Sequence, residues 1–360
     1  MGWKKIQVII FVLVVIVSWN LTGCGRNKMS SENMQKSEAL IPNNAETTHA
    51  TETAGQTEET VTPTEERIVN VSTEEQEITL KNTDFHPAKA FGSNGEYIFL
   101  TQWKDEERKA AFYEMKIGSE LLQETGVEIP TDMNVYGITT DQKEHHYVLM
   151  RSSYEEGGRR SCIREYEGDN LLGEIDISQV MENMAGVNGN FLVDETGNFY
   201  IRGLGGSMYL SEKGEFLWES KNDLQEIKDS YAITLGKDGN IYITYIRDDT
   251  TYLGQVNKKD GTIEKEYILD GISSDDRILA VGQGTDSDFL LYGTASGIWA
   301  FDCESTHLEK RRDMTEGNLP LDEYIIIRAF LPDGRLLIVK NVSENGEIVE
   351  QTLQYIPAGK

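Results

Sequence analysis

The chain has 360 residues and a formal net charge of −27, from 61 acidic and 34 basic residues. So strong a negative charge repels phosphate backbones and therefore argues against nucleic acid as a partner. With 38% hydrophobic and 26% charged residues, the chain has enough apolar material for one large folded domain or two ordinary ones.

Residues 1–23 have the layout of an export signal. Lys4 and Lys5 precede an apolar run at residues 6–17. About twelve residues are too few for a spanning helix, which needs about 18. The run is followed by LTGCG at residues 21–25, a cysteine after small residues that resembles a bacterial lipobox.

This resemblance implies cleavage before Cys24 and attachment of a diacylglycerol to its sulfur. Two acyl chains are sufficient for stable anchoring, so we expect a lipoprotein on the extracellular face of the cell membrane. The alternative is a plain secretory signal with an unrelated cysteine near the cleavage site. Residues 24–66 are rich in Ser, Thr, Asn and Glu, and we expect them to form a disordered acidic tether.

The remaining segment, residues 67–360, contains a repeated phrase. DETGNFYIRG at residues 194–203 and GKDGNIYITY at residues 236–245 both place a Gly-Asn turn before an alternating apolar run. Similar phrases have their turn positions at Gly95, Glu144, Gly197, Gly239, Ser287 and Gly334. A sustained period of about 40 to 50 residues is typical of a propeller or a solenoid.

Each period holds several short apolar runs separated by polar turns. The runs are rich in β-branched and aromatic residues and alternate in polarity, which excludes a helical repeat. Four short antiparallel strands per unit make a propeller blade. The sequence therefore predicts an all-β, six-bladed β-propeller of four-stranded antiparallel blades.

The two ends of this segment are expected to meet. The last unit stops at Lys360 without a fourth strand, and EQEITLKN at residues 75–82 is a lone strand before the first blade. Pairing of residues 75–82 with residues 350–356 would complete the last blade and cover its exposed edge. The alternative is that the chain is a truncated part of a longer protein.

The sequence resembles the six-bladed propeller lipoproteins common in anaerobic, low-GC Gram-positive bacteria. It is also similar to propeller modules that precede the solute-binding domains of sugar and peptide importers. The resemblance rests on LTGC at residues 21–24, DGNIYI at residues 238–243 and SEKGEFLWE at residues 211–219. The resemblance implies a propeller fold and an extracellular binding module. It implies no particular activity, because such repeats specify a fold.

Residue patterns typical of cofactor, metal or nucleophile sites are missing from the sequence. Cys162 and Cys303 belong to blades on opposite sides of the predicted ring, too far apart for a disulfide, so we expect free thiols. His145 and His146 are neighbours in a strand and should point to opposite faces. No cofactor, no metal ion and no catalytic constellation is therefore expected.

One group of residues suggests a ligand site. A basic residue ends the second strand of four blades, and Trp103 holds the equivalent place in the first blade. The four basic residues are Arg151, Arg202, Arg247 and Lys340. Together with Trp103 they would suit a carboxylate-bearing or sugar-like ligand if the strand ends met at the channel mouth. The alternative is that each cation pairs with a nearby carboxylate.

These observations favour a monomeric, lipid-anchored binding module that acts outside the cell. Its partner would be a small anionic or carbohydrate ligand or another protein, and a role accessory to a nutrient importer is expected. Two alternatives stay open. One is a carbohydrate-active hydrolase or lyase on the same scaffold, and the other is the N-terminal part of a longer solute-binding protein. Paired carboxylates, or a His with a Tyr, near the propeller axis would favour the enzyme.

Overall fold

The computed structural model divides the chain into two units, Met1–Glu65 and Glu66–Lys360. The residues that it describes all lie in the second unit. They are residues 75–80, 88–93, 95–104, 109–141, 143, 145–152, 158–182, 187–203, 206–220, 232–314, 323–345 and 347–359. The predicted signal segment, Cys24 and the predicted tether lie outside them. Within the described part, no helix has the length and apolar character needed to cross a bilayer.

The repeated phrase is the turn that joins the first and second strands of a blade. At Gly197 the N–H donates to the carbonyl of Asp194 at 3.0 Å, and the Asp194 N–H donates to the carbonyl of Asn198 at 2.9 Å. An equivalent pair of hydrogen bonds closes the turn at Gly239. Gly197 and Gly239 have φ angles of 81° and 71°, values that strain any residue with a side chain. The turn geometry therefore explains why the sequence repeats.

The strands form six four-stranded sheets, each antiparallel throughout, which we number as blades 1 to 6. A short helix, α2 (Ser178–Met181), follows blade 2. From first to fourth strand, the blades are β2 (Ala88–Ser93), β3 (Tyr97–Lys104), β4 (Lys109–Lys116) and β5 (Gln123–Glu124); β6 (Met133–Thr140), β7 (His146–Ser152), β8 (Ser161–Glu167) and β9 (Asn170–Asp176); β10 (Val187–Val193), β11 (Phe199–Gly203), β12 (Gly206–Leu210) and β13 (Phe216–Ser220); β14 (Ile233–Leu235), β15 (Ile241–Arg247), β16 (Thr250–Val256) and β17 (Ile263–Ile268); β18 (Ile278–Gln283), β19 (Phe289–Gly293), β20 (Gly297–Asp302) and β21 (His307–Arg312); and β22 (Glu323–Phe330), β23 (Leu336–Glu344), β24 (Glu347–Ile356) and β1 (Gln76–Thr79).

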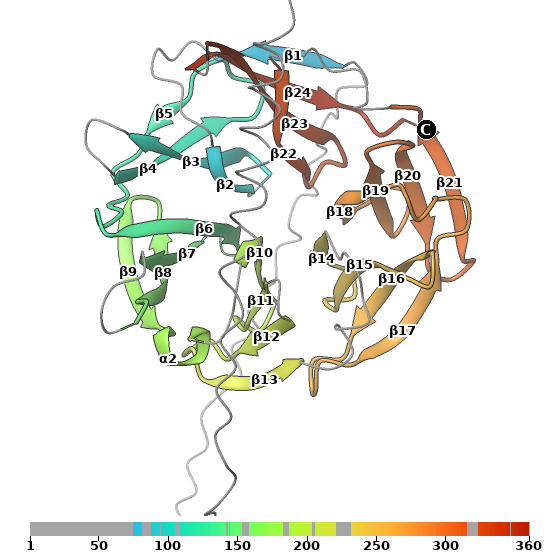
Figure 1. Cartoon of the computed structure of the whole chain (residues 1–360), viewed down its shortest axis with the longest axis horizontal. Helices are drawn as coiled ribbons and strands as arrows, with labels where there is room; N and C mark the ends of the chain where they lie inside the picture. The colour runs from blue at the N-terminus through green and yellow to red at the C-terminus, as the bar shows by residue number, and fades with distance from the viewer. Residues whose placement is uncertain are drawn as a thin grey trace, which may run out of the picture. The chain divides into compact units, whose positions relative to one another are not determined.

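The blades are arranged in a ring with their first strands innermost (Figure 1). Each first strand contacts the first strand of the next blade, and the series β2, β6, β10, β14, β18 and β22 returns to β2. This arrangement confirms the predicted six-bladed propeller.

The core is divided among the six blade interfaces. Six clusters of buried apolar side chains lie one between each pair of neighbouring blades. In the middle of a blade both faces are covered, so β7 and β12 are buried at every position. Each blade therefore depends on its two neighbours to bury its apolar faces.

The ring is closed by β1, which pairs antiparallel with β24 and places Ile78 opposite Leu353. This confirms the predicted pairing of the chain ends, although residues 81–82 of the predicted strand lie outside the described residues. A chain of buried amides supports the same junction. Gln102 of blade 1 donates to Gln351 at 3.0 Å, and Gln351 donates to Asn341 at 2.8 Å.

Replacing Ile78 by Ala tests this closure. Ile78 is buried in the cluster between blades 6 and 1, and truncation of a buried Ile costs about 2–5 kcal/mol. Urea unfolding should show a loss of this size, whereas Thr79→Ala, at an exposed position of the same strand, should have little effect. Equal losses in the two variants would contradict a closing role for β1.

Candidate functional site

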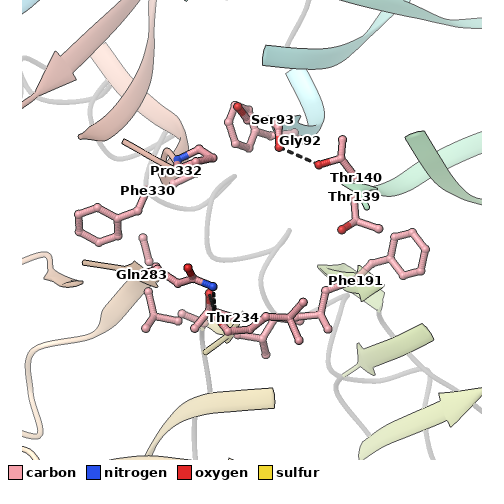
Figure 2. A pocket seen from close by; sticks show the side chains of 18 of the residues that line it. Gly92, Ser93, Thr139, Thr140, Phe191, Thr234, Gln283, Phe330 and Pro332 are labelled. Carbon is pink, nitrogen blue, oxygen red and sulfur yellow. Dashed lines mark hydrogen bonds between the residues drawn. The ribbon is translucent and has the colours of Figure 1, made fainter. Parts of the chain in front are cut away.

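The first strands enclose a pocket of about 940 Å³ at the end of the channel where these strands finish. Its lining comes from all six blades and includes the turns that follow β6, β10, β14 and β22. Figure 2 shows Thr139, Thr140 and Gln283 directed toward the opening, while the rings of Phe191 and Phe330 point away from it, between the blades. Hydroxyl, amide and aliphatic groups therefore face the pocket, and a few charged side chains also line it.

Hydrogen bonds between blades fix the rim of this pocket (Figure 2). Thr140 Oγ1 of blade 2 donates to the carbonyl of Ser93 in blade 1 at 2.8 Å. Gln283 Nε2 of blade 5 donates to the carbonyl of Leu235 in blade 4 at 3.1 Å. Because these bonds tie strand ends that come from different blades, the rim is preorganised.

A cluster of titratable side chains lies beside the pocket in blade 2. Asp141, which lines the pocket, accepts hydrogen bonds from the N–H groups of Lys143 and His145 at 2.8 and 3.0 Å and from the Tyr147 hydroxyl at 3.2 Å. Glu165 Oε1 lies 2.8 Å from His145 Nδ1 and accepts from Tyr147 at 3.0 Å. Burial, together with the two carboxylates, raises the pKa of Tyr147, which therefore remains a hydrogen-bond donor.

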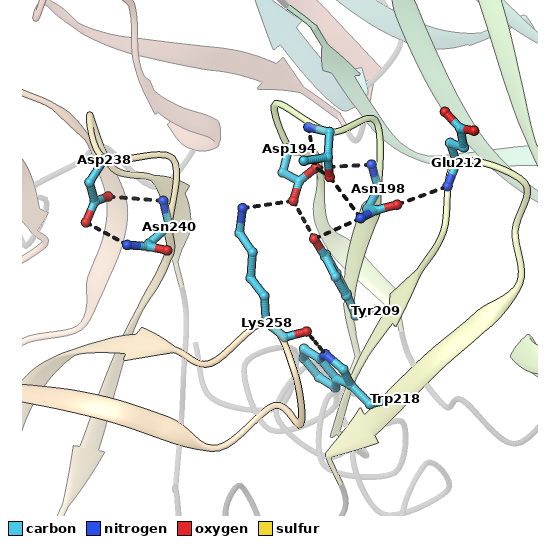
Figure 3. Close-up of polar contacts among 9 residues, drawn as sticks. Asp194, Asn198, Tyr209, Glu212, Trp218, Asp238, Asn240 and Lys258 are labelled. Atoms are coloured by element: carbon cyan, nitrogen blue, oxygen red, sulfur yellow. Dashed lines mark hydrogen bonds and ion pairs between the residues drawn. The ribbon is translucent and has the colours of Figure 1, made fainter.

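A second polar network joins blades 3 and 4 behind the pocket (Figure 3). The side chain of Asp194 is 0% exposed, and its Oδ2 lies 2.9 Å from Lys258 Nζ. Tyr209 donates a short hydrogen bond to the same oxygen, and Thr196 donates to the other oxygen through its N–H and its hydroxyl. The carbonyl of Lys258 in turn accepts from Trp218 Nε1 at 2.7 Å.

Burial alone would raise the pKa of Asp194, but the hydrogen bonds from Thr196, Tyr209 and Lys258 outweigh it and hold the pKa below the usual value of 3.8. Asp194 is therefore ionised at neutral pH, and its charge is compensated by Lys258. Burial, and next the hydrogen bond to Asp194, raise the pKa of Tyr209 to about 12.

Two of the four predicted site cations have partners within their own blades. Nη1 and Nη2 of Arg247 donate to the two carboxylate oxygens of Glu266 at 2.7 Å, and the guanidinium carbon lies 4.9 Å from the centre of the Tyr252 ring. Lys340 Nζ lies 2.9 Å from Glu323 Oε2. For these two residues, the structure favours the alternative of local pairing.

Arg151 and Arg202 do not line the pocket either. Arg151 donates to the carbonyl of Met181 at 2.9 Å, and Arg202 is 7% exposed. None of the four predicted cations is among the described residues that line the pocket. The side chain of Trp103 lies outside the described part.

The ends of these second strands therefore lie away from the pocket, and their meeting at a channel mouth stays a prediction. The first strands, not the second, line the channel. A second strand begins at the rim and, over about seven residues, carries its far end roughly 20 Å away. The pocket-facing residues Thr139, Thr234 and Gln283 were missed. Their position just before the repeated turns could have identified them, because it places them at the ends of the first strands, which line the channel.

The cysteines and histidines lie as the sequence predicted. Cys162 and Cys303 are free, with Cys162 buried and Cys303 partly buried; burial raises the pKa of each to about 11. His146 packs against Phe99 with ring centres 4.1 Å apart, on the face opposite to His145, and its pKa is lowered by burial. Among the described residues, no three His, Cys, Asp or Glu side chains are grouped to hold a metal ion.

Comparison with known proteins gives a likeness of fold. No family model and no curated protein matches the chain. A streptogramin B lyase structure is 12% identical with a TM-score of 0.47, covering 78% of this chain and 97% of that chain. The soluble aldose sugar dehydrogenase of Escherichia coli is 9% identical with a TM-score of 0.45, covering 78% and 99%. Likeness at this level carries no argument about activity.

Replacing Lys258 by Met tests the network between blades 3 and 4. The variant leaves the Asp194 carboxylate buried without its cation, which should cost about 1–3 kcal/mol of stability at neutral pH. Because the folded-state pKa of Asp194 is lowered, this contribution is present above pH 3.8 and is lost as the pH falls through the folded-state pKa. Urea unfolding at pH 7 and below pH 3.8 measures both effects.

The neighbouring Lys259 is exposed and provides a matched control. Lys259→Met should leave the stability unchanged at both pH values. A Lys258→Met variant as stable as the parent at neutral pH would show that the ion pair contributes nothing.

Proposed function

We propose that this chain is a cell-surface lipoprotein whose propeller binds an uncharged, hydroxyl-rich small ligand, such as a carbohydrate, in the channel pocket. The observation that carries the proposal is the chemistry of the pocket lining. Thr139, Thr140, Thr234 and Gln283 place neutral hydroxyl and amide groups between aliphatic side chains. The hydroxyls of Thr140 and Thr234 and one amide N–H of Gln283 donate to backbone carbonyls, which leaves their oxygens as acceptors for a ligand.

The backbone around the pocket supports the same ligand class. Each first strand pairs on one side only, so its other edge offers N–H and C=O groups to the channel. Such groups need partners, either water or a ligand. A sugar hydroxyl both donates and accepts and can therefore satisfy either kind of group.

An anionic ligand, the other small-molecule class expected from the sequence, is disfavoured. The cations proposed to hold it lie outside the pocket, and Arg247 and Lys340 are already paired with carboxylates. The chain also carries a net charge of −27, which repels anions. A membrane-anchored, monomeric receptor for a neutral solute fits an accessory role beside a nutrient importer.

A carbohydrate-active enzyme is the second candidate, because His145, Tyr147, Asp141 and Glu165 form a hydrogen-bonded cluster beside the pocket. Groups of this kind perform general acid–base catalysis when they reach a substrate. Release of products from a bound sugar would favour the enzyme. Binding without turnover would favour the receptor.

The pocket is tested by titrating glucose, galactose, mannose, xylose and their disaccharides into the protein in a calorimeter. Thr139→Val removes a hydroxyl from the wall at nearly constant volume and should weaken sugar binding about threefold to tenfold. Thr131→Val, at an exposed turn position, is the matched control and should bind like the parent. Equal affinities for all three proteins would place the site elsewhere.

The anchor is tested by Cys24→Ala. If Cys24 carries the lipid, this variant should stay unprocessed or be released from the membrane, because no other residue can accept the diacylglycerol. Metabolic labelling with a fatty-acid analogue provides the measurement. Label on the Cys24→Ala protein would contradict the lipoprotein assignment.

A further inference from the structure

Three carboxylates line the channel pocket, and two of them are already engaged. Asp141 accepts hydrogen bonds from two backbone N–H groups and from Tyr147. Asp194 is buried and holds Lys258. Glu195 follows Asp194 directly, is exposed and lines the same pocket. No residue in the described part of the chain donates to its carboxylate.

The Glu195 side chain lies against the turn of the next blade. A Cβ placed on Gly239 would come within 2.6 Å of Glu195 Oε1 and 2.8 Å of Oε2. Glycine at this position therefore leaves space for the Glu195 carboxylate where it lies, at the rim between blades 3 and 4. Glycine at a turn allows another group to approach the backbone closely, and here that group is the Glu195 carboxylate.

The backbone that carries Glu195 is held firmly. Asp194 is fixed by Lys258 at 2.9 Å and by Tyr209. The backbone carbonyl of Lys258 accepts a hydrogen bond from Trp218 Nε1. Figure 3 shows this network extending from the outer strand β13, through Lys258, to the turn after β10. A binding group attached to a fixed turn loses little conformational entropy when it meets a ligand.

The cations of the pocket have acceptors of their own. Lys237 Nζ donates to the carbonyl of Ser287 at 2.7 Å, and Arg328 is directed to the carbonyl of Ile325 at 3.5 Å. Among the described residues, no cation is paired with Glu195, and its carboxylate is an acceptor at the pocket rim.

We propose that Glu195 is the specificity-determining residue of the pocket and accepts hydrogen bonds from two adjacent hydroxyls of the ligand, with Lys258 as its positioning residue. This inference rests on the proposed function. An ionised carboxylate only accepts, and its two oxygens suit a pair of neighbouring donors. Charge-assisted hydrogen bonds are roughly twice as strong as neutral ones, so Glu195 selects the sugars whose hydroxyl pair reaches it.

The experiment compares the parent protein with Glu195→Gln by calorimetric titration of the tightest-binding sugar among glucose, galactose, mannose and xylose. The amide keeps the size of the side chain but loses the charge and one acceptor, so affinity should fall about tenfold. Glu212→Gln removes an exposed carboxylate from another turn of the same blade and should bind like the parent.

Deoxy analogues of the same sugar report specificity rather than folding. The parent should reject the analogue that lacks one of the paired hydroxyls, because the Glu195 carboxylate is then left without a donor. Glu195→Gln should bind the sugar and this analogue with similar affinity. Lys258→Met should lose part of the discrimination, and Lys258→Arg should restore it.

The outcomes separate this inference from the proposed function. Suppose that Thr139→Val weakens sugar binding while Glu195→Gln keeps both the affinity and the discrimination of the parent. The pocket then binds sugars, and the role given to Glu195 is wrong. If the parent protein binds neither the four sugars nor their disaccharides, the proposed function fails, and the inference fails with it.

Discussion

The structure depends on the burial of both faces of every blade. A four-stranded sheet with two apolar faces cannot hide them alone, and each of the six buried clusters lies between two blades. The ring must therefore close, or two faces would stay in water. Pairing of β1 with β24 completes blade 6 with a strand from the other end of the chain. The four residue pairs between these two strands therefore close the ring.

Closure also produces the candidate site. Six first strands brought around one axis leave six strand edges and six strand ends facing a common space, whatever side chains they carry. The particular side chains then decide its chemistry. Thr139, Thr234 and Gln283 give the wall neutral hydrogen-bonding groups. Glu195 adds a carboxylate that no other described residue engages.

Three ion pairs among the described residues join strands or blades of the propeller and leave no free cation for a ligand from Arg247, Lys340 or Lys258. Arg247 with Glu266, and Lys340 with Glu323, each connect strands of one blade. Lys258 with Asp194 connects two blades and is the most buried of these three pairs. Because a buried carboxylate is costly without a cation and hydrogen bonds, this pair fixes the geometry of one side of the rim.

The sequence by itself determined the features that depend on local backbone geometry or on the number of repeats. Gly197 and Gly239 mark turns because only glycine adopts their backbone conformation without strain. The repeat count predicted six blades, and the unpaired strand at residues 75–82 predicted the closure. Free Cys162 and Cys303 followed from the positions of their blades.

Only the tertiary structure decided which residues face the channel and which cations are free. Arg247 and Glu266 are 19 residues apart and meet because β15 and β17 belong to one sheet, a pairing that repeats alone do not specify. Likewise, position at the end of a strand does not tell on which face of the ring that end lies. In an antiparallel blade successive turns alternate between the two faces, and this alternation places Glu195 at the pocket and Arg247 far from it.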